Sequence, residues 1–298
     1  MSYIQELQDF LKHKSNKRKC IVIYGPTGSG KTDMSIEIAK FLETEIISTD
    51  SRQIFKYMNI GTGKITQEEM QGVQHHMMDV VTPNQSFSMG DFVRASQVVM
   101  NELWEDDKVP MLVGGTGLYI DSLIFERNAA EVGSDSELRK QLDVLSNEEL
   151  YQKLIEIDPE YAAELHMNNR PYVERGIEIM TMTGKSKREF RAEKKLLYDV
   201  LFLTPDYGDR ANLYNRINTR VEMMFDAGAE DEVKSLLEKG YNFSDFGMNS
   251  IGYREFEGYF TGDIKKEEVI DKIQKNSRNY AKRQCTWFRK YEAYKNIK

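Results

Sequence analysis

The stretch Gly25-Pro26-Thr27-Gly28-Ser29-Gly30-Lys31-Thr32 fits the phosphate-loop pattern G-x-x-x-x-G-K-[ST]. It directly follows an apolar run at residues 20–24 and precedes a helical spacing of apolar residues from 34 to 42. This order of strand, glycine loop and helix predicts a phosphate site, because the glycines let backbone N–H groups curl around an anion. We expect Lys31 to supply a mobile positive charge and Thr32 to ligate Mg²⁺.

Strand patterns alternate with long helical patterns along much of the chain. The predicted strands are residues 20–24, 45–48, 109–113 and 200–203. Such alternation predicts an α/β fold with a parallel sheet of the phosphate-loop NTPase type, flanked by helices. Ligands of these sheets bind beyond the carboxyl ends of the strands. The residues that follow the strands are therefore the first candidates for a functional site.

The segment between residues 127 and 195 lacks any convincing strand pattern, and its apolar residues recur at helical spacing. We interpret residues 128–195 as a helical domain inserted into the α/β core. Residues 1–127 and 196–298 then form the core itself, with a helical part toward the C-terminus.

Composition indicates a soluble globular protein, with 40% hydrophobic and 30% charged residues in a chain of 298. No apolar run approaches the roughly 20 residues that span a bilayer. Two cysteines are too few for a disulfide framework, and Cys20 opens a predicted buried strand. We expect a cytoplasmic protein without a membrane partner.

The net charge of −7 argues weakly against nucleic-acid binding, but the charge is unevenly distributed. Basic residues interleaved with aromatic residues dominate the stretch 272–298. From charge alone, a solvated helix face and a nucleic-acid contact both remain open for this stretch.

Asp50 is the carboxylate that follows a predicted strand near the phosphate loop, whereas the third strand runs into Gly114-Gly115-Thr116. ATPases and small-molecule kinases usually place a second acidic residue at a strand end to organise Mg²⁺ and water. The absence of such a second acidic residue from the strand ends of this sequence suggests that the bound phosphate is a leaving group. Local sequence leaves Asp50 either a general base, a metal ligand or a helix cap.

Further blocks occupy characteristic positions around these strand ends. They are residues 46–55, 58–64, 72–79, 112–119, 250–255 and 280–289. In this order and spacing, and together with the phosphate loop, they closely resemble the bacterial tRNA dimethylallyltransferases. The resemblance spans roughly residues 19–291.

That resemblance implies transfer of a dimethylallyl group from dimethylallyl diphosphate to the exocyclic N6 amine of the adenine 3′ of the anticodon, with Mg²⁺ as cofactor. The phosphate loop would hold the diphosphate leaving group. Asp50 matches the family's general base, Thr116 its hydroxyl near the bridging oxygen, and Arg220 an arginine that grips the diphosphate.

The resemblance also implies a tRNA partner, bound through its anticodon stem-loop to a monomeric enzyme. The residues that match the family's tRNA contacts are Asp50, Ser51, Arg52, Gln53, Thr116, Arg139, Pro171, Tyr172, Val173, Glu174, Arg175, Asn249, Ser250, Ile251, Gly252, Tyr253 and Arg254. The inserted helical domain would then clamp the stem-loop.

Other functions remain open at this point. The same chemistry with a free adenine nucleotide as acceptor would make the protein an adenylate isopentenyltransferase. A phosphate-loop kinase of a small metabolite, or a non-catalytic RNA-binding or nucleotide-binding module, would also use the loop. Asp50 and Thr116 favour an enzyme, because a module that only binds has no need of a base beside its phosphate site.

Overall fold

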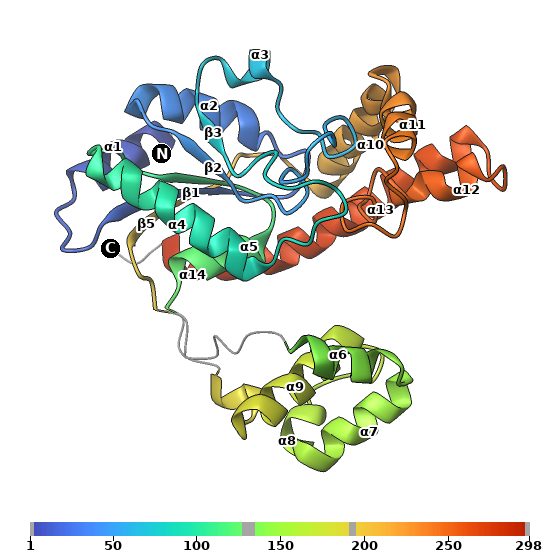
Figure 1. The fold of residues 1–298 in the computed structure, drawn as a ribbon. Coiled ribbons are helices and arrows are strands. Elements are labelled where there is room, and N and C mark those ends of the chain that lie inside the picture. Colours follow the sequence, from blue (N-terminus) through green and yellow to red (C-terminus); the bar gives the residue numbers. More distant parts are fainter. Residues whose placement is uncertain (1–2, 127–134, 191–194, 296–298) are drawn as a thin grey trace. The chain divides into compact units, whose positions relative to one another are not determined.

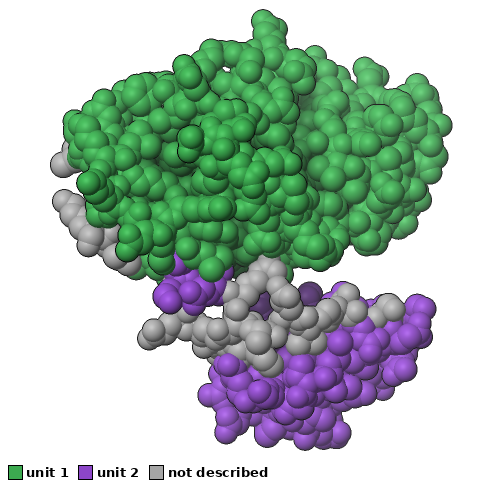
Figure 2. Space-filling model, turned by 60° about the vertical axis from the view of Figure 1, so that its left-hand side comes forward, with its two compact units in different colours: residues 1–124, 197–298 green, residues 125–196 purple. Residues whose placement is uncertain are grey.

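The computed structural model describes residues 3–126, 135–190 and 195–295. The chain divides into two compact units, shown in different colours in Figure 2. The larger unit comprises residues 1–124 and 197–298, and the smaller unit comprises residues 125–196. The expected insertion of residues 128–195 falls within the smaller unit, while the expected boundary at 127 and 128 lies outside the described residues.

A parallel sheet forms the centre of the larger unit (Figure 1). Its described strands lie in the order β3-β2-β4-β1-β5, with all pairs parallel. The strands are β1 (Lys19–Tyr24), β2 (Ile46–Ser48), β3 (His75–His76), β4 (Met111–Gly114) and β5 (Asp199–Leu203). Because β1 lies between β4 and β5, the phosphate loop leaves the sheet from an interior strand.

Both faces of the sheet are buried, which explains why its strands are almost continuously apolar. Ile21 and Ile23 of β1 pack with helices α1 and α2 on one face. Tyr24, which points the other way, packs its ring against Phe202 and against aromatic rings from the C-terminal helices. Helix α1 (Tyr3–Lys12) precedes β1, and the helices that follow β1 before the smaller unit begins are α2 (Lys31–Leu42), α3 (Gln67–Met70), α4 (Met89–Glu105) and α5 (Gly117–Ile124).

The C-terminal part of the larger unit is helical, as expected. Its elements are α10 (Arg210–Asp226), α11 (Ala229–Glu238), η2 (Arg254–Phe256), α12 (Glu257–Phe260), α13 (Lys266–Phe288), η3 (Arg289–Tyr291) and α14 (Glu292–Lys295). A separate hydrophobic core packs α10, α11 and α13 against the segment that follows β2. It includes Val221, Val233, Ile273 and Met58. These helices therefore hold the segment after β2 in place at the carboxyl edge of the sheet.

The smaller unit is built from helices, with an isolated bridge between Phe125 and Leu196 at its base. Its helices are α6 (Ser136–Asp143), α7 (Asn147–Ile157), α8 (Pro159–Ala162), α9 (Arg170–Thr183) and the short η1 (Lys187–Phe190). Leu150 and Leu154 of α7 pack against Val173 and Ile177 of α9 in one apolar core. Capping explains where α7 begins, since Ser146 and Glu149 form a reciprocal capping box.

The structure confirms the four predicted strands but adds β3, which the sequence analysis missed. His75 and His76 pair with Ile46 and Ile47 at the edge of the sheet. This strand has only two polar residues, so it carries no apolar signal, and main-chain pairing alone defines it. Cys20 is fully buried with a free thiol, as expected. Within the described ranges, no helix has the length and apolar content needed to cross a membrane.

Gly114 closes β4 against the end of β2 with almost no space beside it. A Cβ atom at this position would lie 2.4 Å from Thr49 Oγ1 and 2.7 Å from the Thr49 backbone. We expect Gly114→Ala to lower the free energy of unfolding by about 1–3 kcal/mol, the typical range for overpacking. Urea denaturation would measure it.

Gly90→Ala is the matched control, because its Cβ would meet only the flexible end of Arg94, at 3.3 Å, and the Ser88 hydroxyl, at 3.6 Å. It lies in the first turn of α4, where alanine favours the helix. Equal stability losses in the two variants would contradict the packing interpretation of Gly114.

Candidate active site

The phosphate loop joins β1 to α2 and turns at glycines that no other residue replaces easily. Gly28 has φ +78° and Gly30 has φ +89°, both in the left-handed region. Gly30 precedes the first residue of α2 directly. Thr27, Lys31 and Thr32 line a cavity at this edge of the sheet. The helix N-terminus and the loop amides make this a favourable place for an anion.

Lys31 is held against its own loop. Its Nζ atom donates hydrogen bonds to the carbonyl oxygens of Gly25, at 3.0 Å, and Pro26, at 2.8 Å. Burial and then the positive charge of Arg220 lower the pKa of Lys31, the charge of Asp50 opposes them, and the resulting pKa is about 8. An anion in the cavity would favour the charged form of this side chain.

Arg220 reaches the same cavity from α10. Its Nη2 atom donates to the carbonyl oxygen of Gly63 at 3.0 Å. A Cβ atom at Gly63 would lie 1.6 Å from Nη2, so the guanidinium lies directly on the backbone at that residue. Burial also lowers the pKa of Arg220, and the nearby carboxylates of Asp50 and Glu69 raise it.

Asp50 lies in a turn immediately after β2. Its Oδ1 atom accepts a hydrogen bond from the backbone N–H of Arg52 at 2.8 Å. Thr116 Oγ1 accepts from the backbone N–H of Ser51 at 3.1 Å. Asp50, Ser51 and Arg52 line the cavity, whereas Thr116 supports this turn from outside the set of lining residues. Asp50 is thus oriented by a turn and does not cap a helix.

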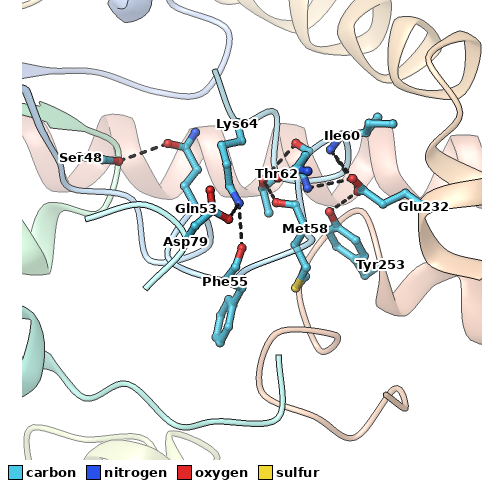
Figure 3. A network of polar contacts seen from close by, with 11 residues as sticks. Ser48, Gln53, Phe55, Met58, Ile60, Thr62, Lys64, Asp79, Glu232 and Tyr253 are labelled. Carbon is cyan, nitrogen blue, oxygen red and sulfur yellow. Dashed lines mark hydrogen bonds and ion pairs between the residues drawn. The ribbon is translucent and has the colours of Figure 1, made fainter. Parts of the chain in front are cut away.

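Gln53 ends this turn and connects it to the next loop. It accepts from Ser48 Oγ at 3.2 Å (Figure 3). Its Nε2 atom donates to Gly63 O at 3.3 Å. The Gly63 carbonyl therefore contacts both Gln53 and Arg220.

Gln284 of α13 connects the phosphate loop to the turn after β4. Its Oε1 atom accepts from the N–H of Thr27, and its Nε2 atom donates to the carbonyl of Gly115, both at 2.9 Å. The side chain is buried and lines the cavity. Gln284 lies within the sequence block 280–289, but no role for it could be predicted, because an isolated glutamine on a helix gives no signal of what it contacts.

The cavity bounded by these groups has a volume of about 320 Å³. Its charged lining residues, among those described, are Lys31, Asp50, Arg52, Arg220, Arg254 and Arg283. Five cations therefore face one carboxylate, a balance that favours a strongly anionic ligand.

Tyr280 of α13 also lines the cavity, and the sequence analysis gave it no individual role. Burial, followed by the charge of Asp50, raises the pKa of its hydroxyl to about 12, so the hydroxyl stays protonated at neutral pH. Its aromatic ring, in a cavity otherwise rich in cations, is a surface on which a flat base can stack.

A metal site made by protein side chains alone is not found in the described part of the chain, where no three His, Cys, Asp or Glu residues gather. Asp50 and the hydroxyl of Thr32 nevertheless line one cavity. One carboxylate, a hydroxyl and the oxygens of a bound phosphate are a donor set that suits Mg²⁺, which keeps several waters. The residues present fit this ion.

The structure brings part of the predicted tRNA-contact set to the cavity. Besides the Asp50 turn, the residues at its lining are Asn249, Ile251 and Arg254. Ser250 and Tyr253 are fully buried instead, and the Tyr253 hydroxyl donates to Glu232 at 2.5 Å. Both side chains are buried, and a contact of either residue with RNA stays a prediction.

The remaining predicted contacts belong to the smaller unit. Arg139 donates to both oxygens of the buried Glu178 carboxylate, at 3.0 and 3.1 Å, and Arg175 bonds to the same carboxylate. Val173 is fully buried in the helical core, and a contact of this residue with RNA stays a prediction. Tyr172 is exposed. Arg139 therefore links α6 to α9 through Glu178, and Arg175 binds the same carboxylate from within α9.

Pro171 and Glu174 also have structural roles in α9. Pro171 lies in the first turn of the helix, where its missing N–H needs no partner. Glu174 pairs with Arg170 at 2.6 Å. A contact of either residue with RNA stays a prediction.

Comparison with known proteins agrees with the geometry. A family model described as IPP transferase matches residues 53–291, and a model of papillomavirus helicases matches residues 1–67, which include the phosphate loop. A tRNA dimethylallyltransferase of Alkaliphilus oremlandii is 44% identical over 93% of this chain and 90% of the relative. One of Bacillus cytotoxicus is 42% identical over 93% of this chain and 89% of the relative.

Solved structures of the same kind of transferase are also similar to this chain. A tRNA isopentenylpyrophosphate transferase of Staphylococcus epidermidis matches with TM-score 0.66 and 39% identity, over 91% of this chain and 90% of the other. A eukaryotic dimethylallyltransferase acting on tRNA matches with TM-score 0.80 and 30% identity, over 91% of this chain and 70% of the other.

The lowered pKa of Lys31 predicts that anion binding depends on pH. Lys31 is charged below about 8 and loses its charge as the pH rises through that value. We expect the affinity for methyl diphosphate to fall between about pH 7.5 and 9.5, by at most about tenfold per pH unit for one lost proton. Isothermal titration calorimetry would measure the fall.

Lys31→Arg is the control, because a guanidinium stays protonated throughout this range. We expect weaker binding in that variant without the decline at high pH. A decline of the same size in both proteins would show that a group other than Lys31 titrates.

Proposed function

This chain belongs to the IPP transferase family, and on that premise we propose that it transfers the dimethylallyl group of dimethylallyl diphosphate to the N6 amine of the adenine 3′ of the anticodon in tRNA. The product is N6-(dimethylallyl)adenosine, and diphosphate is released. A relative that this chain matches over 90% of the relative's length is named tRNA dimethylallyltransferase. This name supports the reaction and its tRNA acceptor.

One observation carries the proposal: five cations and one carboxylate line the same cavity. Diphosphate is a compact polyanion, and Lys31 and Arg220 are placed to bind it in the ground state. As the bond between C1 of the dimethylallyl group and the bridging oxygen breaks, negative charge accumulates on the leaving diphosphate. Fixed positive groups in a partly desolvated site stabilise that charge strongly.

Mg²⁺ is the proposed cofactor, which would be held by the hydroxyl of Thr32 and by phosphate oxygens of the donor. When bound, it would neutralise part of the charge on the diphosphate and help to orient it. The hydroxyl of Thr32 follows Lys31 directly in α2, so the residue for the metal and the residue for the phosphate begin the same helix.

Asp50 is the proposed general base. The N6 nitrogen of adenine forms a bond to C1 while the C1–oxygen bond breaks, and a proton leaves N6 for the Asp50 carboxylate. Oδ1 is oriented by the N–H of Arg52, and the other oxygen accepts no hydrogen bond from a described residue. Thr116 holds the Asp50 turn through Ser51, which supports a positioning role for this hydroxyl in the reaction.

The acceptor has to leave its stack in the anticodon loop to reach Asp50. Arg52, Arg254 and Arg283 supply charges for RNA phosphates around the cavity, and Tyr280 supplies an aromatic face for the base. One chain provides all of these groups, which supports a monomer. A reaction on tRNA is consistent with a cytoplasmic enzyme.

A free adenine nucleotide is the second acceptor that the chemistry allows. The deciding assay incubates the protein with labelled dimethylallyl diphosphate, Mg²⁺ and either an unmodified anticodon stem-loop or AMP. We expect label in the stem-loop only. Label in AMP alone would support an adenylate isopentenyltransferase, and label in neither would contradict both transferase functions and return a kinase to consideration.

Asp50→Asn tests the base while preserving the shape of the side chain and an acceptor for the Arg52 N–H. We expect turnover to fall by roughly 10²–10⁴, the range typical of a general base. Affinity for methyl diphosphate in the absence of metal should stay close to that of the parent protein. A parallel loss of that affinity would recast Asp50 as mainly a structural residue.

A further inference from the structure

Glu232, in the first turn of α11, binds a backbone turn at the edge of the cavity. Its carboxylate accepts the N–H groups of Asn59 (2.9 Å), Ile60 (2.9 and 3.0 Å) and Gly61 (3.1 Å). It also accepts the hydroxyl of Tyr253 at 2.5 Å. Figure 3 shows this carboxylate facing the turn. One ionised side chain thus binds three successive backbone donors and a phenol.

From these contacts we propose that Glu232 is a positioning residue for the diphosphate site, acting through the turn Asn59–Gly63 and Arg220. Glu232 does not line the cavity, so it acts on the diphosphate site indirectly, through the residues that it holds. The inference rests on the proposed function, because the group that it positions is the proposed ligand of the diphosphate donor.

The turn itself is compact and has few ways to shift. The N–H of Gly63 donates to Ile60 O at 2.9 Å, and the N–H of Lys64 donates to Asn59 O at 2.9 Å. Thr62 Oγ1 donates to Met58 O at 2.7 Å. A Cβ atom at Gly61 would lie 2.5 Å from the ring of Tyr253, so the turn packs directly on that ring. Movement at Asn59 is therefore transmitted to Gly63.

Lys64 holds the far end of the turn. Its Nζ atom donates to Phe55 O at 2.8 Å and to Asp79 Oδ1 at 2.7 Å (Figure 3). With Glu232 at one end and Lys64 at the other, the carbonyl of Gly63 has a defined position. That carbonyl accepts from Arg220 at 3.0 Å and from Gln53 at 3.3 Å.

The charge of Glu232 matters because several donors converge on it. Hydrogen bonds to an ionised acceptor are about twice as strong as neutral ones. A glutamine in its place would present an NH₂ group to some of the same N–H donors, and two donors cannot pair. Burial and the nearby Glu232 raise the pKa of Tyr253 well above its usual range, so the phenol remains a donor.

The test compares Glu232→Gln with Glu230→Gln. Glu230 lies on the same helix and also accepts from a tyrosine, Tyr259 at 2.9 Å, and from Lys266 at 3.1 Å, but it does not contact the turn. Steady-state transfer to the stem-loop is measured with each variant, alone and combined with Arg220→Ala. Thermal unfolding is followed for every protein.

We expect Glu232→Gln to raise the KM for dimethylallyl diphosphate by roughly tenfold, a coupling typical of residues in one hydrogen-bond network. In the Arg220→Ala background the same substitution should change KM by less than about twofold, because its effect acts through that guanidinium. Glu230→Gln should leave KM close to the parent value even if it lowers the melting temperature.

The inference would be overturned if Glu232→Gln raised the KM for dimethylallyl diphosphate equally in the parent and in the Arg220→Ala protein. It would also be overturned if Glu232→Gln left the KM of the parent protein unchanged. A failure of the parent protein to transfer label is a different result, since it contradicts the proposed function itself. Should Glu232→Gln not fold, Tyr253→Phe removes one donor to the carboxylate and is tested in the same cycle. A rise in KM for Tyr253→Phe that disappears in the Arg220→Ala background supports the inference. Additive effects of Tyr253→Phe and Arg220→Ala on KM overturn it.

Discussion

Among the described residues that line the cavity at the carboxyl edge of the sheet, Lys31 and Arg220 share a single carboxylate, Asp50, and the rest of the site is organised around this imbalance of charge. Withdrawing charges from water is unfavourable unless polar groups compensate. The protein supplies carbonyl oxygens: those of Gly25 and Pro26 for the lysine, and that of Gly63 for the arginine. Carbonyl dipoles compensate a cation less completely than an anion does. A diphosphate, whose departure the proposed reaction requires, is therefore a ligand that these charges favour.

The parallel sheet explains how distant segments meet at this place. Because the strands run in the same direction, the residues after β1, β2 and β4 all lie at one edge. Helix α13 then adds Gln284, whose amide connects the loop after β1 to the turn after β4. Through this contact α13 links the loops that follow two neighbouring strands. Helices α10 and α11 do the same for the segment after β2.

The smaller unit uses its charges differently. Arg139 and Arg175 are both paired with Glu178, which is fully buried. A buried carboxylate requires such partners, so these arginines are held by the fold before any RNA arrives. Basic residues in a segment that resembles an RNA-binding region therefore have a structural task as well, and their number alone is a poor measure of the charge available to an acceptor.

Local sequence determined the phosphate loop, the four longer strands, the helical insertion and the carboxylate after the second strand, because each depends on residues that are neighbours in the chain. Local sequence did not predict the short strand His75–His76, since main-chain pairing defines it without an apolar pattern. Resemblance to a family located Asp50, Thr116 and Arg220, but not what holds them. Only the tertiary structure decided that Tyr253 faces the core, that Gln284 links two loops and that Glu232 binds a turn far from it in sequence. Those roles arise from contacts between segments brought together by packing, and such contacts leave no periodic signal in the chain.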